Sequence, residues 1–303
     1  MLNQTGFLFA LIFIGYLLAK LGVVERGAAR SLAKLENYVF VPALIIRTFT
    51  EKFTVERLVS SWRLMLVCAA ILVFTTVISI FIPRLIDKDK YHRNIYTYGF
   101  AFSNFGFMGN AVVMTLYPDI FLEYTLFTLP LWVLLYTWGV PVLLIPKAEG
   151  DSSVKSRLKS FVNPMFISLI VAIILGLIGV KFPSWLANAV SVSSDCMSPV
   201  AMLLTGIAIS TIDLKATLAN VKIYIASIIR LLVIPIAFIL AAKLLPLSEN
   251  EYVLSVCMLA MPFGLNTVII PEAYGKDTTL ATGLTLISSL LGCITIPLVL
   301  TVM

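Results

Sequence analysis

The chain has 303 residues, of which 60% are hydrophobic and only 13% are charged. A soluble domain carries about 25% charged residues, so this composition excludes an ordinary soluble protein. The net charge of +6 does not indicate nucleic-acid binding, because the basic residues lie in short connections between apolar segments. Lys, Arg, Asp and Glu are all absent from residues 1–19, 64–83, 160–180, 252–271 and 278–303. Because roughly 20 apolar residues cross a bilayer as a helix, we predict an all-α polytopic membrane protein.

Ten apolar segments follow one another, and we number them in chain order. They cover approximately residues 5–21, 35–49, 62–83, 95–117, 121–145, 161–180, 190–211, 220–243, 251–274 and 278–301. The first has no basic stretch before it and no small-residue cleavage site after it, so we expect a retained helix rather than a removed signal peptide. The second is expected to be short, because Arg47 interrupts it. The connection 146–160 is the longest polar one.

The basic residues predict the orientation of these segments. Connections after odd-numbered segments hold fifteen Lys and Arg residues, and connections after even-numbered segments hold six. Basic residues are concentrated in cytoplasmic loops. We therefore expect the odd connections, 146–160 included, to be cytoplasmic and both termini to be extracytoplasmic, in a multi-pass protein of the cell (inner or plasma) membrane.

The two halves of the chain resemble each other at a spacing of 156 to 158 residues. The matched pairs are Pro42 with Pro199, Gly106 with Gly264, Asn110 with Asn266, Tyr117 with Tyr274, and Pro141 with Pro297. The spacing predicts two repeats of five segments, residues 1–145 and 161–303. Because five is odd, the second repeat must be inverted relative to the first, as in many secondary transporters.

Two segments contain residues that interrupt a helix, at 103–110 in the fourth segment and 261–267 in the ninth. Glycine and proline destabilise a helix interior, and in lipid the freed backbone groups need partners inside the protein. Tight helix packing could also explain them. We favour a substrate site, in which the two interruptions cross at mid-membrane and half-helix N-terminal ends attract an anion. The candidate substrate-binding residues are Asn104, Gly106, Gly109, Asn110, Pro262, Gly264, Asn266 and Thr267.

Three further charged residues are candidates for function. Arg230 lies deep in the eighth segment, where a charge is costly, so we expect it to bind an anion or to pair with Asp195 or a backbone carbonyl. Asp195 is the acid that we expect to be buried in the membrane, and Glu36 occupies a comparable place before the second segment, so either is a candidate to carry a coupling proton. Both could instead be helix-start residues at the membrane interface. A Na⁺ site built from carbonyls would leave no trace in the sequence.

Other chemistries find little support. The four cysteines fall in apolar segments without metal-like spacing, so we expect small buried side chains, and because His92 is the only histidine we expect no metal site. Nucleotide-binding loops and nucleophile motifs are absent from the sequence. We therefore expect no cofactor and no enzymatic activity.

Several motifs resemble the auxin efflux carrier (PIN-like) family, in particular its short prokaryotic members, over essentially the whole chain. They are Asn104 with Met108-Gly109, Asn163-Pro164, Met261-Pro262-Phe263-Gly264, and the stretch Pro-Glu-Ala-Tyr-Gly-Lys-Asp at 271–277. The resemblance implies two inverted five-helix repeats. It also implies a scaffold from segments 1, 2, 6 and 7, and a transport domain from segments 3–5 and 8–10 that moves like an elevator. Ser103 and Phe263 differ from the plant pattern, which has proline and a polar amide at these positions.

The resemblance further implies organic-anion substrates, either auxin or dicarboxylates such as malate and malonate, and a homodimer formed through the scaffold. We therefore predict a secondary transporter of a small organic anion that works by alternating access. We expect the fourth segment to hold the carboxylate and the ninth to supply mainly backbone groups. The alternatives are a Na⁺- or H⁺-coupled symporter of another anion on the same fold, or a membrane-embedded substrate sensor.

Overall fold

The computed structural model describes residues 2–25, 27–145, 164–210 and 219–303. These residues form helices, and the only β-type pairing among them is one isolated antiparallel bridge between Ser103 and Phe263. The predicted all-α class is confirmed. The connection 146–160 and Asn163 lie outside the described residues.

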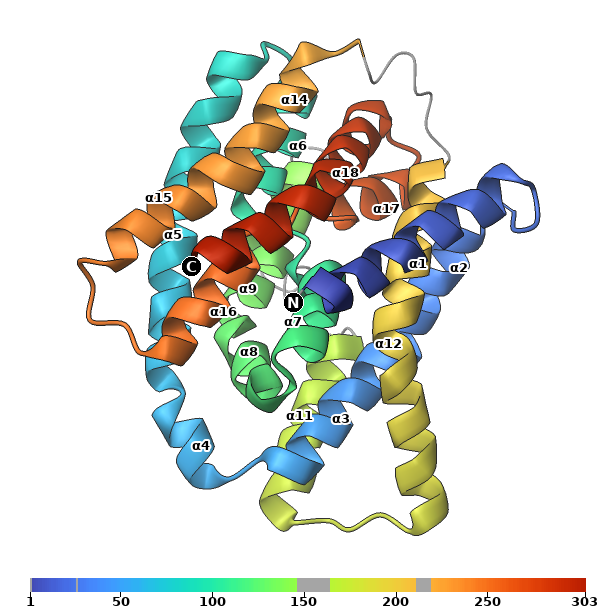
Figure 1. The fold of residues 1–303 in the computed structure, drawn as a ribbon, viewed down its shortest axis with the longest axis vertical. Helices are drawn as coiled ribbons and strands as arrows, with labels where there is room; N and C mark the ends of the chain where they lie inside the picture. Colours follow the sequence, from blue (N-terminus) through green and yellow to red (C-terminus); the bar gives the residue numbers. More distant parts are fainter. Residues whose placement is uncertain (1, 26, 146–163, 211–218) are drawn as a thin grey trace, which may run out of the picture.

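A helix occupies each of the ten predicted segments, and several segments hold more than one (Figure 1). The η labels mark π-helical turns, except η3, which is a 3-10 turn. The elements are α1 (Leu2–Lys20), α2 (Ala28–Leu35), η1 (Glu36–Phe40), α3 (Val41–Lys52), α4 (Val55–Ser60), α5 (Trp62–Ile86), α6 (Lys90–Ala101), η2 (Phe105–Gly109), α7 (Asn110–Leu116), η3 (Pro118–Ile120), α8 (Phe121–Phe127), α9 (Leu129–Leu134), η4 (Leu135–Leu144), α11 (Pro164–Ile178), α12 (Ser184–Ser210), α14 (Val221–Ile228), η5 (Ile229–Val233), α15 (Ile234–Ala242), α16 (Glu249–Leu259), α17 (Asn266–Ala273) and α18 (Thr279–Val302).

Several helices have the length and apolarity that a membrane span requires. Four qualify as single spans among the described residues, namely Val55–Ile86, Ser184–Ser210, Val221–Ala242 and Thr279–Val302. A fifth forms if the pair Pro118–Phe127 and Leu129–Leu144, bent by 41°, is counted as one span. These helices support a polytopic membrane protein. The ten-helix inverted repeat stays a prediction.

Two of the predicted segment bounds were wrong. Arg47 does not interrupt the second segment, because its guanidinium pairs with Asp195 at 2.7 Å and Glu51 at 3.3 Å, and α3 continues to Lys52. The seventh helix, α12, begins at Ser184 rather than near 190. Serines in its first half lower the local hydropathy, but helix formation does not depend on hydropathy alone.

The helices α1 and α3 pack against α12, and α11 packs against α3 (Figure 1). The contact between α1 and α12 depends on glycines on both helices. A Cβ on Gly206 would overlap the backbone of Ile12 and Tyr16, and a Cβ on Gly15 would overlap the backbone of Leu203. Such close backbone approach is how small residues join helices in membranes.

The remaining helices pack mainly with one another, with α5 against α6 and α14 against α18. Ion pairs near the two ends of the continuous stretch α2–η1–α3 link it to this second group. The Lys52 Nζ lies 3.4 Å from Asp119 Oδ1, and the Arg30 Nη2 lies 3.1 Å from Glu272 Oε1. Because these side chains are largely exposed, the pairs contribute little to stability.

Candidate functional site

The two predicted interruptions are confirmed as breaks in helical structure, and they meet. The helix α6 ends at Ala101 and helical structure resumes at Phe105, while α16 ends at Leu259 and α17 begins at Asn266. Between these helix ends the two non-helical segments run antiparallel and form the bridge between Ser103 and Phe263.

Hydrogen bonds across the crossing satisfy the freed backbone groups. The amide of Asn104 donates to the carbonyl of Pro262 at 2.8 Å. The Ser103 hydroxyl donates to the carbonyl of Met258 at 2.9 Å, and the Phe263 amide donates to the Ser288 hydroxyl oxygen at 3.1 Å. Such internal pairing lets unwound backbone persist at membrane depth.

Phe263 fills the crossing on the ninth-segment side. Its ring lies against Gly99, where an added Cβ would overlap it, and it meets the ring of Phe100 edge-on at 5.4 Å between centroids. Phe263 is completely buried. The aromatic side chain therefore takes up space that a polar amide would leave available, which matches the difference from the plant pattern at this position. Gly99 did not feature among the sequence-based candidates.

The second half of the fourth segment presents its N-terminal end at the crossing. η2 and α7 together run from Phe105 to Leu116, and the Gly109 amide donates to the Asn104 carbonyl at 2.8 Å. The amides before Gly109, including those of Gly106 and Phe107, belong to the first turn and have no intrahelical acceptor. This end of the helix carries a partial positive charge.

A small cavity of about 60 Å³ adjoins this helix end. It has room for one carboxylate or a few waters. No carboxylate and no basic side chain lines the cavity. Its lining residues are Asn37, Val41, Gly106, Phe107, Asn110, Trp132, Tyr136, Pro164, Asn266 and Ile270. The lining therefore combines residues of this helix end with the neutral side-chain amides of Asn37, Asn110 and Asn266.

The cavity brings together three of the predicted residues, Gly106, Asn110 and Asn266, and adds residues that sequence reasoning missed. Asn37 comes from η1 and Tyr136 from η4. A polar amide inside an apolar segment was the available signal for Asn37. Tyr136 gave none, because tyrosines are ordinary in membrane helices.

The other predicted residues shape the crossing without lining the cavity. Asn104 is 2% exposed, and its Nδ2 has no hydrogen-bond partner among the described residues. Thr267 donates to the carbonyl of Gly264 at 2.6 Å. Gly109 lies against the Tyr124 hydroxyl, which donates to the Phe105 carbonyl at 2.8 Å. Asn104 therefore supplies a buried donor that is still available.

Arg230 is 1% exposed and reaches the crossing from η5. Its Nε donates to the carbonyl of Met261 at 3.2 Å, and its Nη1 donates to the carbonyl of Phe100 at 3.4 Å. Of the roles expected for it, contact with backbone carbonyls is the one observed. Asp195 pairs with Arg47 instead.

Glu36 and Asp195 occupy different environments, and neither begins a helix. Glu36 lies in the uninterrupted helical stretch of α2, η1 and α3, where it is completely buried, and neither carboxylate oxygen has a hydrogen-bond partner among the described residues. Asp195 lies in the middle of α12 with a side chain that is 63% exposed. The helix-start interpretation was therefore wrong for both residues. Of the two, Glu36 is the buried acid.

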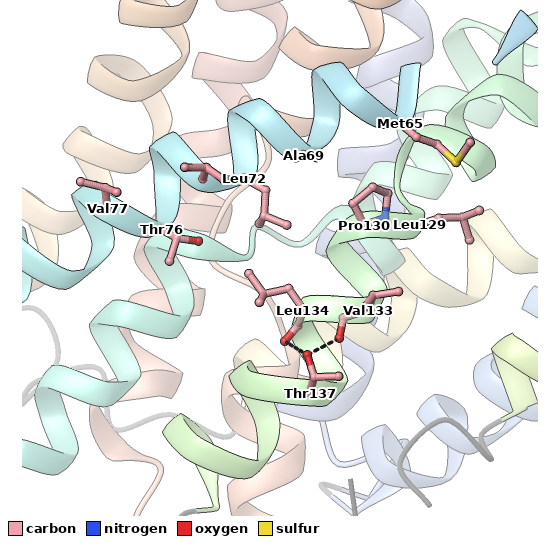
Figure 2. Close-up of a pocket in the computed structure, with 11 residues that line it drawn as sticks. Met65, Ala69, Leu72, Thr76, Val77, Leu129, Pro130, Val133, Leu134 and Thr137 are labelled. Carbon is pink, nitrogen blue, oxygen red and sulfur yellow. Dashed lines mark hydrogen bonds between the residues drawn. The ribbon is translucent and has the colours of Figure 1, made fainter. Parts of the chain in front are cut away.

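A larger cavity of about 640 Å³ is an apolar groove between α5 and α9 (Figure 2). Val73 and Val77 are exposed along it, and the Thr137 hydroxyl donates a hydrogen bond to the carbonyl of Val133 at 2.7 Å. Few polar groups converge on this groove, in contrast to a site for a small polar ligand. Its surface suits bilayer hydrocarbon and not an anion.

A third cavity, of about 430 Å³, opens beside the ion pair between Arg30 and Glu272. It shares Ala208, Val268 and Thr282 with a small neighbouring cavity that extends to Leu265 and Thr285 at the crossing. We call the larger one the Arg30 chamber. The small cavity, of about 10 Å³, lies between the Arg30 chamber and these two residues.

No group of three or more His, Cys, Asp and Glu residues that could hold a metal ion occurs in the part of the chain that the structure describes.

A family model described as "Membrane transport protein" matches residues 2–300. No curated protein matches the chain.

Proposed function

This chain belongs to the membrane transport protein family, the family of auxin efflux carriers and PIN-like transporters, and we propose that it moves a small organic anion across the membrane. The cavity at the crossing carries this proposal. A helix N-terminal end and neutral amides surround it, so they can stabilise a carboxylate without a basic side chain.

In the proposed site the carboxylate accepts hydrogen bonds from the backbone amides of Gly106 and Phe107 and from the side chains of Asn110 and Asn266. Asn104 lies beside the site at the crossing, where its buried Nδ2 has no hydrogen-bond partner among the described residues. Gly109, Pro262, Gly264 and Thr267 hold the broken backbone in position around it. The size of the cavity favours a small carboxylate or one end of a dicarboxylate.

We propose alternating access by elevator-type movement of segments 3–5 and 8–10 against segments 1, 2, 6 and 7. The packing supports this division, because α1 and α3 pack mainly on α12 and α11 packs on α3, while α5 packs mainly on α6 and α14 on α18. The anion cavity has walls from both groups, with Asn37 and Pro164 on one side and Asn110 and Asn266 on the other.

The proposed setting is the cell membrane, with both termini extracytoplasmic and a homodimer formed through the scaffold. The basic connections then place the Arg30 chamber on the cytoplasmic side. The proposed transport is uniport of the anion. The alternatives are symport coupled to a proton through Glu36 or Asp195, symport coupled to Na⁺, and a sensor that binds the anion without transporting it.

Purified protein tests the proposal in two steps. We expect malate, malonate or an auxin-like monocarboxylate to raise the thermal unfolding temperature in detergent, whereas an uncharged amide analogue should not. In proteoliposomes, internal carboxylate should drive uptake of the labelled compound by counterflow. A carboxylate that stabilises the protein without counterflow would indicate a sensor. If no carboxylate in the screen either stabilises the protein or exchanges, the proposal is wrong.

The Arg30 chamber provides a separate prediction. The pair between Arg30 and Glu272 joins α2 to α17, so it must break whenever the two helix groups separate. We expect Glu272→Gln to speed exchange about two- to five-fold, since a half-exposed pair contributes up to about 1 kcal/mol. The unfolding temperature should barely change. Lys222→Gln is the matched control, because Lys222 pairs with Asp87 inside the moving group. Equal exchange rates in the two variants would contradict the role of this contact.

A further inference from the structure

Arg230 is a buried cation at the centre of the fold, and its charge is not balanced by an acid. Its side chain is 1% exposed, and no acidic residue forms an ion pair with it within the described ranges. An isolated charge at membrane depth is costly, so such residues face the protein interior and have a functional or structural partner. The partners of Arg230 must therefore be backbone groups.

Those partners come from both broken helices. Phe100 lies in the last turn of α6, and Met261 follows the end of α16. Arg230 donates to both carbonyls, at 3.4 Å and 3.2 Å. The carbonyls at a helix C-terminal end lack intrahelical partners and carry a partial negative charge. One guanidinium thus binds a carbonyl at the C-terminal end of α6 and another just after the C-terminal end of α16.

The local sequence explains how the side chain reaches this position. Pro235 cannot donate to the carbonyl one turn earlier, so the regular α-helical pattern cannot continue through it. The π-helical turn Ile229–Val233 precedes Pro235 and absorbs the mismatch. A π-helical turn inserts an extra residue and turns the side chains around it. Arg230 lies on this turn, in an otherwise apolar helix.

Converging carbonyl ends of broken helices are also the groups that coordinate Na⁺ in transporters built on this principle. Here a covalently attached guanidinium donates a hydrogen bond to each of these carbonyls and brings a positive charge to them. A mobile cation at the same place would meet both the steric bulk and the positive charge of Arg230.

We propose that Arg230 is the resident cation of the crossing, in the place that a coupling alkali-metal ion would otherwise occupy. The proposal rests on the proposed function and specifies its coupling: the anion moves without Na⁺, because the charge that Na⁺ would supply is built into the chain. Loss of the Arg230 side chain should leave two converging carbonyl ends without a cation and so create a requirement for one.

The test compares NaCl with choline chloride at equal ionic strength, on the full chain in detergent and in proteoliposomes. The wild-type protein should unfold at the same temperature, and exchange carboxylate at the same rate, in both salts. Arg230→Met removes the charge and nearly keeps the length. We expect it to unfold earlier, to exchange at least ten-fold more slowly in choline chloride, and to regain stability with Na⁺ or millimolar methylguanidinium.

Arg230→Lys keeps the positive charge and should remain active and independent of Na⁺, although with weaker hydrogen bonding. If Arg230→Met does not fold, the exchange rate of Arg230→Lys with and without Na⁺ tests the proposal instead. Three results would overturn the proposal: Na⁺-specific stabilisation or stimulation of the wild type, undiminished exchange by folded Arg230→Met in choline chloride, or a folded Arg230→Lys protein without exchange. The unfolding comparison needs no substrate, so it tests Arg230 even if the carboxylate proposal fails.

Discussion

Replacing Asn110 and Asn266 together with alanine is expected to abolish carboxylate-induced stabilisation and counterflow, while the protein stays folded. Both side chains line the cavity at the crossing, from opposite broken helices. A hydrogen bond to a charged group contributes about 1.5–3 kcal/mol. Each single replacement should therefore weaken binding by about 10- to 100-fold, and the double replacement should reduce it below detection.

Asn188→Ala is the matched control, because Asn188 is an exposed amide on α12 and does not line the cavity. It should bind and exchange like the wild type. Thermal shift measures binding, and size-exclusion chromatography reports the folded state. Unchanged stabilisation in a well-folded Asn110/Asn266 double variant would rule out the cavity as the carboxylate site.

The two single variants also decide how the broken helices share the anion. The sequence predicted that the fourth segment holds the carboxylate and the ninth contributes mainly backbone. Asn266 nevertheless lines the same cavity as Asn110. We therefore expect Asn110→Ala and Asn266→Ala to weaken binding by similar factors. A large loss for Asn110→Ala beside a small one for Asn266→Ala would support the original asymmetry.

Gly206→Ala should destabilise the protein strongly, although alanine is the better helix former by about 1 kcal/mol. An added Cβ would overlap the backbone of Ile12 and Tyr16 on α1. Backbone cannot move aside as a side chain can, so the two helices must separate. Overpacking costs about 1–3 kcal/mol or more, which outweighs the gain in propensity. Thermal unfolding in detergent should show a clear decrease.

Gly6→Ala is the control within the same pair of helices. No atom lies within 4 Å of a Cβ built there, so the same substitution should be neutral or slightly stabilising. Equal unfolding temperatures for Gly6→Ala and Gly206→Ala would show that α1 and α12 do not depend on this close contact.

Hydropathy, glycine and proline predicted much of this protein because they report on local physical constraints. Charge-free apolar runs identify helices that can enter a bilayer, and the interruptions at 103–110 and 261–267 identify where those helices break. Both breaks appear in the structure, facing each other at Ser103 and Phe263. The family resemblance rested on the same stretches and agrees with the family to which the chain belongs.

Partners between distant residues could not be predicted in this way. The period of a helix tells which residues share a face, but not which helix that face meets or how far it is rotated. Only the tertiary structure therefore paired Arg47 with Asp195, buried Glu36 without a hydrogen-bond partner among the described residues, and added Asn37 and Tyr136 to the cavity.

The sequence by itself determined the local features of the protein: apolar helices, two breaks, polar amides at the breaks and one arginine deep in an apolar segment. The tertiary structure decided which of these features contact one another. It separated the N-terminal end that faces the cavity beside Asn110 from the C-terminal ends that meet Arg230. The physical reason is that a helix end acts through its direction in space, and that direction depends on packing between segments more than 100 residues apart.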